Sequence, residues 1–205
     1  MKKIILIIFI LLIQTVNAKG SDIQKETILF LGDSLTEGLG VNKEEAYPSL
    51  VQNLIKTNLN KEISIINGGV SGSTTSDGLA RLKWYLRKKP SIILIALGAN
   101  DGLRGLNLKK TQENLEEIVI NAKDSGAKVL LAGMLMPPNY GPNYTQDFEK
   151  MYRDIQKKYN LKSMPFLLDG IAGKQEFNQR DGIHPNAKGH ILIAKKVFEF
   201  LKDEL

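Results

Sequence analysis

Apolar residues gather in five short runs along the chain, and each run ends close to a glycine, a proline or an aspartate. Unbroken apolar runs of this length are typical of strands that are buried on both faces of a sheet. We therefore expect five strands, in the segments Thr27–Leu31, Ile63–Ile66, Ile92–Leu97, Val129–Met134 and Phe166–Leu168.

Between these runs, apolar residues recur every three or four positions, as they do on one face of a helix. Tyr47–Leu59 is the first such segment, and Gly126 is suited to end the third. Strand and helix patterns alternate five times, which predicts a parallel five-stranded sheet with helices on both faces, a three-layer α/β/α sandwich. The four later helices are marked by Leu79, Leu82 and Leu86; by Leu115, Ile118, Val119 and Ala122; by Phe148, Met151, Tyr152 and Ile155; and by Ile191, Ile193, Ala194, Val197, Phe198 and Leu201.

Residues 1–18 have the layout of a secretory signal peptide. Two lysines precede an unbroken apolar run of ten residues, and a more polar tail ends at Val16-Asn17-Ala18. The apolar run is too short for a membrane span, which needs about 20 residues. We expect cleavage after Ala18, one domain over residues 19–205, and a secreted or periplasmic protein. An uncleaved anchor is the alternative.

Composition narrows the possible partners and chemistries. The formal net charge is +6, and removing the two lysines of residues 1–18 lowers it to +4. The remaining lysines are scattered among acidic residues, which argues against a nucleic-acid partner. The absence of cysteine excludes disulfides, thiol catalysis and thiolate metal sites. Since no apolar helix face is left obviously exposed, we expect a monomer.

The last four residues, Lys202-Asp203-Glu204-Leu205, match a retention signal of the endoplasmic reticulum. Such a signal acts only where a receptor reads it. The composition, rich in Ile and Lys, looks bacterial, so we interpret the match as a coincidence at a charged helix end.

Ser34 directly follows the first predicted strand, in the motif Gly32-Asp33-Ser34-Leu35. A serine hydroxyl becomes nucleophilic when a base accepts its proton and a third group orients that base. Serine is also common as a helix cap, so its position alone is weak evidence.

The base and its orienting group are both present near the end of the chain. Asp181 and His184 are three residues apart, so the carboxylate can hold one imidazole nitrogen while the other faces the serine. The alternative is a surface loop with a chance aspartate and histidine. His190, the second of two histidines, lies within a predicted helix with no acid at a useful spacing, and we expect it to be structural or solvated.

Acyl transfer also needs hydrogen-bond donors for the oxyanion that develops on the substrate. Asn100 and Gly72 follow the third and second predicted strands, so the Asn100 amide and the Gly72 N–H are candidates, with the Ser34 N–H as a third. The carboxyl ends of parallel strands meet at one edge of a sheet, which predicts that these groups converge. Pro137, Pro138 and Tyr140 follow the fourth strand, where they either line a substrate pocket or form a rigid turn.

With these motifs in order, the chain resembles the SGNH, or GDSL, hydrolase superfamily over nearly its whole length after residue 18. The four matching blocks are Gly32-Asp33-Ser34-Leu35, Gly72 after the second strand, Gly98-Ala99-Asn100-Asp101, and Asp181-Gly182-Ile183-His184. Segments 77–82, 98–105 and 139–141 resemble the bacterial periplasmic arylesterase-like branch, which has thioesterase, protease and lysophospholipase activities. Thr36 and Ser73 depart from the pattern of this branch, which leaves specificity open.

The resemblance implies a flavodoxin-like fold and an acyl-ester substrate. It implies Ser34 as the nucleophile, His184 as the base and then the acid, and Asp181 as the orienter. It also implies an oxyanion hole made by the Ser34 N–H, Gly72 and Asn100, with Asp33 bracing the loop. Such an enzyme needs neither a metal nor an organic cofactor.

Three other functions remain open from the sequence. A carbohydrate O-acetylesterase would use the same groups with a small acyl pocket. A non-catalytic binding module of flavodoxin-like fold would need no Asp-X-X-His motif. A metal site made of Asp181, His184 and His190 is disfavoured because histidines six residues apart do not share a helix face.

Overall fold

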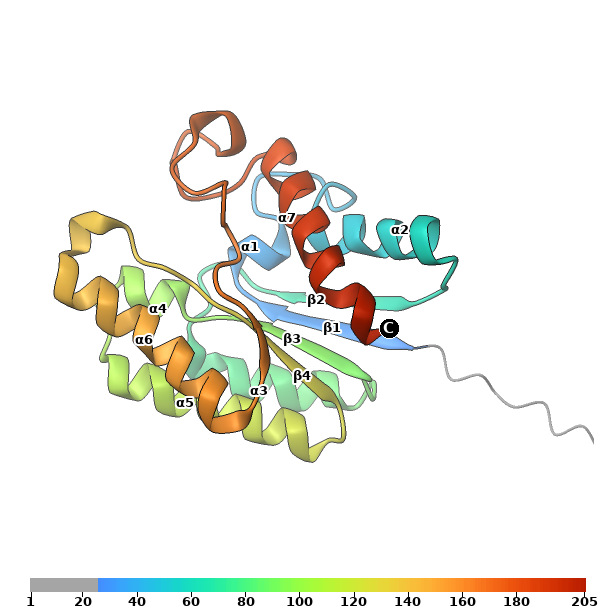
Figure 1. The fold of residues 1–205 in the computed structure, drawn as a ribbon, viewed down its shortest axis with the longest axis horizontal. Coiled ribbons are helices and arrows are strands. Elements are labelled where there is room, and N and C mark those ends of the chain that lie inside the picture. Colours follow the sequence, from blue (N-terminus) through green and yellow to red (C-terminus); the bar gives the residue numbers. More distant parts are fainter. Residues whose placement is uncertain (1–25) are drawn as a thin grey trace, which may run out of the picture.

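The computed structural model describes residues 26–205, so the predicted signal peptide lies outside the described residues. Its centre is a parallel sheet in the order β2-β1-β3-β4-β5, in which every neighbouring pair of strands is parallel (Figure 1). This is the strand order of flavodoxin-like folds, and it confirms the fold class expected from the sequence. The strands are β1 Thr27–Gly32, β2 Ser64–Gly69, β3 Ile92–Ala96, β4 Lys128–Ala132 and β5 Lys162–Met164.

The prediction of the fifth strand was wrong. Phe166–Leu168 forms a turn after the strand, and β5 is Lys162–Met164. As the last strand of the sheet, β5 has one free edge, and only Met164 of its three residues is buried. β5 therefore lacks the continuous apolar run that marks the central strands. The apolar run at Leu167 and Leu168 is explained by burial, because both side chains of this turn pack into the core.

Helices cover both faces of the sheet (Figure 1). α2 and α7 pack against each other on one face, and α3, α5 and α6 pack side by side on the other. Two short helices, α1 and α4, follow β1 and β3 directly. The bounds are α1 Ser34–Glu37, α2 Tyr47–Leu59, α3 Thr75–Leu86, α4 Ala99–Leu103, α5 Leu108–Asp124, α6 Pro142–Tyr159 and α7 Ala187–Leu201, with short 3-10 helices η1 Pro138–Tyr140, η2 Gln175–Phe177 and η3 Lys202–Glu204.

The carboxyl edge of the sheet is closely packed. A Cβ atom at Gly69, the last residue of β2, would lie 2.1 Å from the Glu37 nitrogen. Only glycine allows this approach, so α1 lies directly on the end of β2. This contact holds the last residues of α1, and with them the single-turn helix, at the sheet edge.

The C-terminal residues pack against the fold. The Glu204 carboxylate accepts hydrogen bonds from Lys128 (2.6 Å) and Lys162 (2.7 Å), and Leu205 packs on the core. The match to a retention signal therefore falls on residues that have a structural role. Among residues 26–205, no helix is both long enough and apolar enough to cross a membrane.

Candidate active site

Ser34 is the first residue of α1, at the point where β1 ends. The Asp33 side chain caps this helix, since its Oδ1 accepts a hydrogen bond from the Leu35 N–H at 3.0 Å. Gly38 ends the helix in the left-handed conformation after a single turn. The Ser34 side chain is thus fixed at the sheet edge by short-range structure, and the residue is 8 % exposed.

His184 links Ser34 to Asp181. Its Nε2 lies 2.9 Å from the Ser34 Oγ, and its Nδ1 lies 2.7 Å from the Asp181 Oδ2. The other carboxylate oxygen of Asp181 accepts from the N–H groups of Ile183 and His184, both at 3.0 Å. These contacts orient the carboxylate toward the imidazole, and the imidazole toward the serine.

Hydrogen bonds favour the charged form of Asp181. Burial acts to raise the pKa of this carboxyl, but hydrogen bonds from the His184 N–H, the His184 ring and the Ile183 N–H outweigh it and lower the pKa below its ordinary value. A carboxylate in this state accepts a hydrogen bond from the Nδ1–H of the imidazole, so Nε2 carries no proton and can accept a hydrogen bond from a hydroxyl.

The three candidate oxyanion donors lie on adjoining segments. Ser34 and Asn100 line the same cleft, whereas Gly72 does not line it. The Asn100 Nδ2 donates to the Ser73 carbonyl at 2.9 Å, which ties the start of α4 to the loop that contains Gly72. The Gly72 carbonyl in turn accepts from Arg104 at 3.0 Å. The structure therefore fixes the Gly72 loop beside Asn100.

Glu37 holds the same loop from the other side. Its carboxylate accepts from the Ser71 N–H at 2.7 Å and also from the Ser71 hydroxyl. Gly72 itself has a φ of +75°, a conformation that a side chain would strain. Sequence reasoning identified the glycine but not the side chains that hold its loop.

Asp33 is an ionisable residue that is almost completely buried from solvent. It is 1 % exposed, and its Oδ2 has no hydrogen-bond partner within residues 26–205. Burial raises its pKa to about 6, although the Leu35 N–H and the charges of His184 and Arg81 act in the opposite direction. Its Oδ1 caps α1, in agreement with the bracing role that the family resemblance implied.

His190 has a different environment from His184. It is 1 % exposed, its Nδ1 accepts from the Tyr47 N–H at 3.2 Å, and its ring stacks on the Tyr47 ring. Burial lowers the pKa of His190 to about 4, so the ring is neutral at pH 7. The structure does not bring His190 together with Asp181 and His184, and residues 26–205 contain no group of three His, Cys, Asp or Glu side chains placed to hold a metal ion.

A cleft of about 770 Å³ opens beside Ser34 and His184. Pro137, Pro138 and Tyr140 line it, and the Tyr140 hydroxyl donates to the Leu103 carbonyl at 2.9 Å. Most residues of the apolar wall of the cleft were not predicted from the sequence. Much of this wall directly follows β4 and β5, and the same position after a strand had identified Pro137 and Pro138. The missed apolar residues include Leu103, Met134, Leu135, Met136, Phe166, Leu168 and Ile183.

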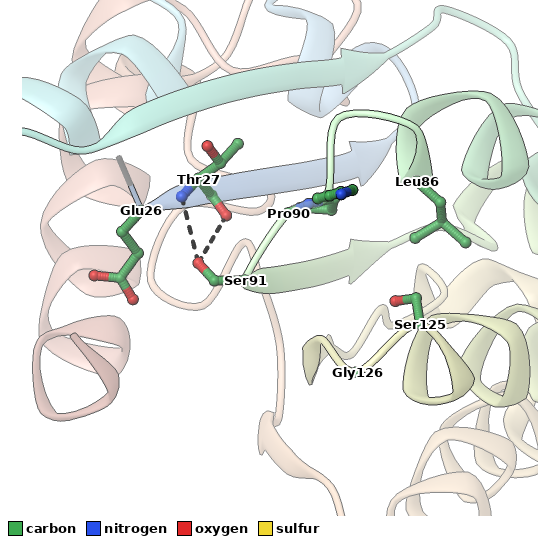
Figure 2. Close-up of a pocket in the computed structure, with 8 residues that line it drawn as sticks. Glu26, Thr27, Leu86, Pro90, Ser91, Ser125 and Gly126 are labelled. Atoms are coloured by element: carbon green, nitrogen blue, oxygen red, sulfur yellow. Dashed lines mark hydrogen bonds between the residues drawn. The ribbon is translucent and has the colours of Figure 1, made fainter. Parts of the chain in front are cut away.

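A second pocket, of about 570 Å³, lies at the opposite edge of the sheet, where β1 and β3 begin. Figure 2 shows the Ser91 hydroxyl beside the main chain of Thr27, to which it is joined by hydrogen bonds of 3.3 and 3.1 Å. Pro90, Leu86 and Ser125 also line this pocket. It contains no arrangement of a base and an orienting acid, so the cleft at the carboxyl edge is the candidate active site.

A parallel sheet of this order, with Ser34, Asn100 and His184 around one cleft at its carboxyl edge, is typical of the SGNH class of hydrolases. The chain belongs to the GDSL-like Lipase/Acylhydrolase family, whose sequence profile matches residues 30–192.

Curated relatives span most of the chain. It is 36 % identical to an esterase, TesA, of Pseudomonas aeruginosa over 86 % of this chain and 88 % of that protein. It is 39 % identical to an arylesterase of Vibrio mimicus, with 88 % of each chain covered. It is 35 % identical to the thioesterase 1/protease 1/lysophospholipase L1 of Escherichia coli K12, over 82 % of this chain and 80 % of that protein.

Solved structures share the same fold. A crystal structure of TesA superposes with a TM-score of 0.84 at 36 % identity, covering 88 % of this chain and all of the other. The psychrotrophic esterase EstA of a Pseudoalteromonas species, inhibited by monoethylphosphonate, superposes with a TM-score of 0.83 at 37 % identity, covering 88 % and 98 % of the two chains.

Proposed function

We propose that this protein is a serine esterase that hydrolyses carboxylic acyl esters through an acyl-enzyme intermediate. The observation that carries the proposal is the continuous contact from the Ser34 Oγ to the His184 Nε2 (2.9 Å) and from the His184 Nδ1 to the Asp181 Oδ2 (2.7 Å). Family membership and the names of the relatives support the same reaction class.

In the first half of the reaction, the Ser34 Oγ attacks the ester carbonyl while His184 takes its proton. His184 then gives that proton to the departing alcohol, which leaves the acyl group on Ser34. In the second half, His184 activates a water molecule that releases the acid and restores the serine. Asp181 holds the imidazole in the required tautomer and stabilises its charged form.

The Ser34 N–H, the Gly72 N–H and the Asn100 amide are the proposed oxyanion donors. One Asn100 N–H bonds the Ser73 carbonyl, and the second N–H of the same amide is available for the oxyanion. Loss of one such donor typically costs about 2.7–4 kcal/mol of transition-state stabilisation.

The lining of the cleft supports a small-molecule substrate with an apolar acyl group. Buried Met134 and Met136 and partly exposed Leu135 lie along it, together with the proposed wall residues Pro137, Pro138 and Tyr140. Thioesters and lysophospholipids, named for the Escherichia coli relative, also fit this chemistry. A carbohydrate O-acetylesterase would be expected to have a smaller and more polar cleft, and a binding module would not need the Ser–His–Asp contacts.

The test is hydrolysis of nitrophenyl esters from acetate to long acyl chains by the wild type, Ser34→Ala and His184→Ala. Each variant should lose several orders of magnitude in kcat, since both groups act in the chemical step. Ser163→Ala is the matched control for Ser34→Ala, because Ser163 lies outside the cleft. Turnover near the wild-type value in Ser34→Ala, or failure of a fluorophosphonate to label the wild type at Ser34, would reject the proposal.

We also propose that the protein is exported, that cleavage occurs after Ala18, and that residues 19–205 act as a monomeric domain. The lysines and apolar run of residues 1–18 support export. The N-terminal sequence and the native mass of the protein isolated from the producing cells test these proposals directly.

A further inference from the structure

Asp181 and His184 belong to a loop that is closed upon itself. Asn178 and Pro185 form an isolated antiparallel bridge, and the Gln179 N–H donates to the His184 carbonyl at 2.8 Å. These contacts fix the imidazole relative to the carboxylate within the loop. They do not fix it relative to Ser34, which lies 150 residues earlier in the chain.

The Gln179 side chain joins this loop to the segment that contains Ser34. Its Nε2 donates to the Leu39 carbonyl at 2.6 Å and to the Pro185 carbonyl at 3.0 Å. The Leu39 N–H donates to the Ser34 carbonyl at 3.1 Å. One amide group thus bridges the residue after His184 and a residue bonded to the main chain of Ser34.

Gln179 is distinctive among the residues of this loop. Within the described part of the chain, apart from His184 itself, it is the one side chain of residues 178–185 that hydrogen-bonds the segment 33–46. It does not line the cleft, so it has no direct contact with a substrate bound there.

Gly40 gives a second, independent indication of the same junction. A Cβ atom at Gly40 would lie 2.2 Å from the Gln179 Oε1, and the φ of Gly40 is +82°. Any side chain at position 40 would therefore displace Gln179 or strain the backbone. The backbone of the Ser34 segment approaches Gln179 in a way that only glycine allows.

We propose that Gln179 is a positioning residue that holds the His184 loop against the Ser34 segment, so that His184 stays within hydrogen-bond distance of the Ser34 hydroxyl. The inference rests on the proposed function, since it concerns the same serine and histidine. The amide of Gln179 has two N–H donors, and it donates to carbonyls on two separate segments without adding a charge. A displacement of about 1 Å between reacting groups lowers rates by roughly a hundredfold.

The test compares Gln179→Met with Gln175→Met in the protein that comprises residues 19–205. Methionine has nearly the shape of glutamine but no N–H donor, and Gln175 is an exposed residue of η2 outside the cleft. The number of active sites is first determined by titration with a fluorophosphonate. The measurements are then kcat per titrated site, KM for a nitrophenyl ester, and the rate at which the fluorophosphonate labels the protein. Counting titrated sites removes any effect of protein that has failed to fold.

We expect Gln179→Met to lower kcat and the labelling rate together by about tenfold to a hundredfold, with KM changed by less than about twofold. Gly40→Ala should lower the same two rates from the other side of the junction. Equal kcat and labelling rates in Gln179→Met and Gln175→Met would overturn the positioning role. If Ser34→Ala still turned over, the proposed function itself would fail, whatever the behaviour of Gln179.

Discussion

The buried carboxyl of Asp33 makes a specific prediction about stability. Burial raises its pKa from 3.8 to about 6, so the folded protein disfavours the ionised form. At roughly 1.4 kcal/mol per pKa unit, this difference corresponds to about 3 kcal/mol of destabilisation when the group is charged. Asp33→Asn keeps the oxygen that caps Leu35 and removes the charge.

The sign of the effect depends on pH. Below pH 3.8, the carboxyl is protonated in both folded and unfolded chains, and its charge has no influence. Between pH 3.8 and about 6, the unfolded chain loses its proton while the folded chain keeps it, so this group lowers stability as the pH rises. Above about pH 6, the full destabilisation is present.

The assay is urea unfolding of the wild type and Asp33→Asn at pH 4 and pH 8. The new amide has N–H donors without partners, and this cost of about 1–3 kcal/mol is the same at both pH values. The free energy of unfolding of Asp33→Asn, relative to that of the wild type, should therefore rise by about 2 kcal/mol from pH 4 to pH 8. Asp147→Asn, at an exposed position on α6, controls for the loss of one negative charge. If the change in relative unfolding free energy between pH 4 and pH 8 were no larger for Asp33→Asn than for Asp147→Asn, a raised pKa of Asp33 would be refuted.

Two further predictions concern His190 and Tyr140. Burial lowers the pKa of His190 from 6.5 to about 4, so between these values the unfolded chain gains a proton that the folded chain does not, and stability falls as the pH falls. Glutamine does not titrate, so His190→Gln should lack this loss of about 3 kcal/mol in the free energy of unfolding between pH 7 and pH 4, measured by urea unfolding. An equal loss of stability in the wild type and the variant would contradict a lowered pKa of His190. Tyr140→Ala removes apolar surface from the cleft wall, and buried apolar surface contributes roughly 25 cal/mol per Å² to binding. The variant should therefore raise KM for long acyl esters by about tenfold and leave KM for acetate esters nearly unchanged. An equal change for both ester classes would place Tyr140 outside the acyl pocket.

Much of the fold could be predicted from local patterns. β1, β3 and β4 are central strands buried on both faces, and their continuous apolar runs identified them. α2 was predicted with the bounds that the structure has, because one apolar stripe faces the core. The edge strand β5 was misplaced because it has little buried surface and so no such run.

The candidate site was predictable for a topological reason. Ser34 and Asn100 follow parallel strands that lie side by side, so their carboxyl ends must meet at one edge of the sheet. Asp181 and His184 were recognisable as a pair because a three-residue spacing places both side chains on one side of a turn.

The amino-acid sequence by itself determined which groups are present, their order, and the layers of the fold, since these follow from short-range periodicity and parallel-strand geometry. Only the tertiary structure decided the 2.9 Å contact between Ser34 and His184, the junction through Gln179, and the raised pKa of Asp33. Each of these depends on contacts or burial created by residues far apart in the chain, and no local pattern encodes the distance between two such residues or the water excluded around them.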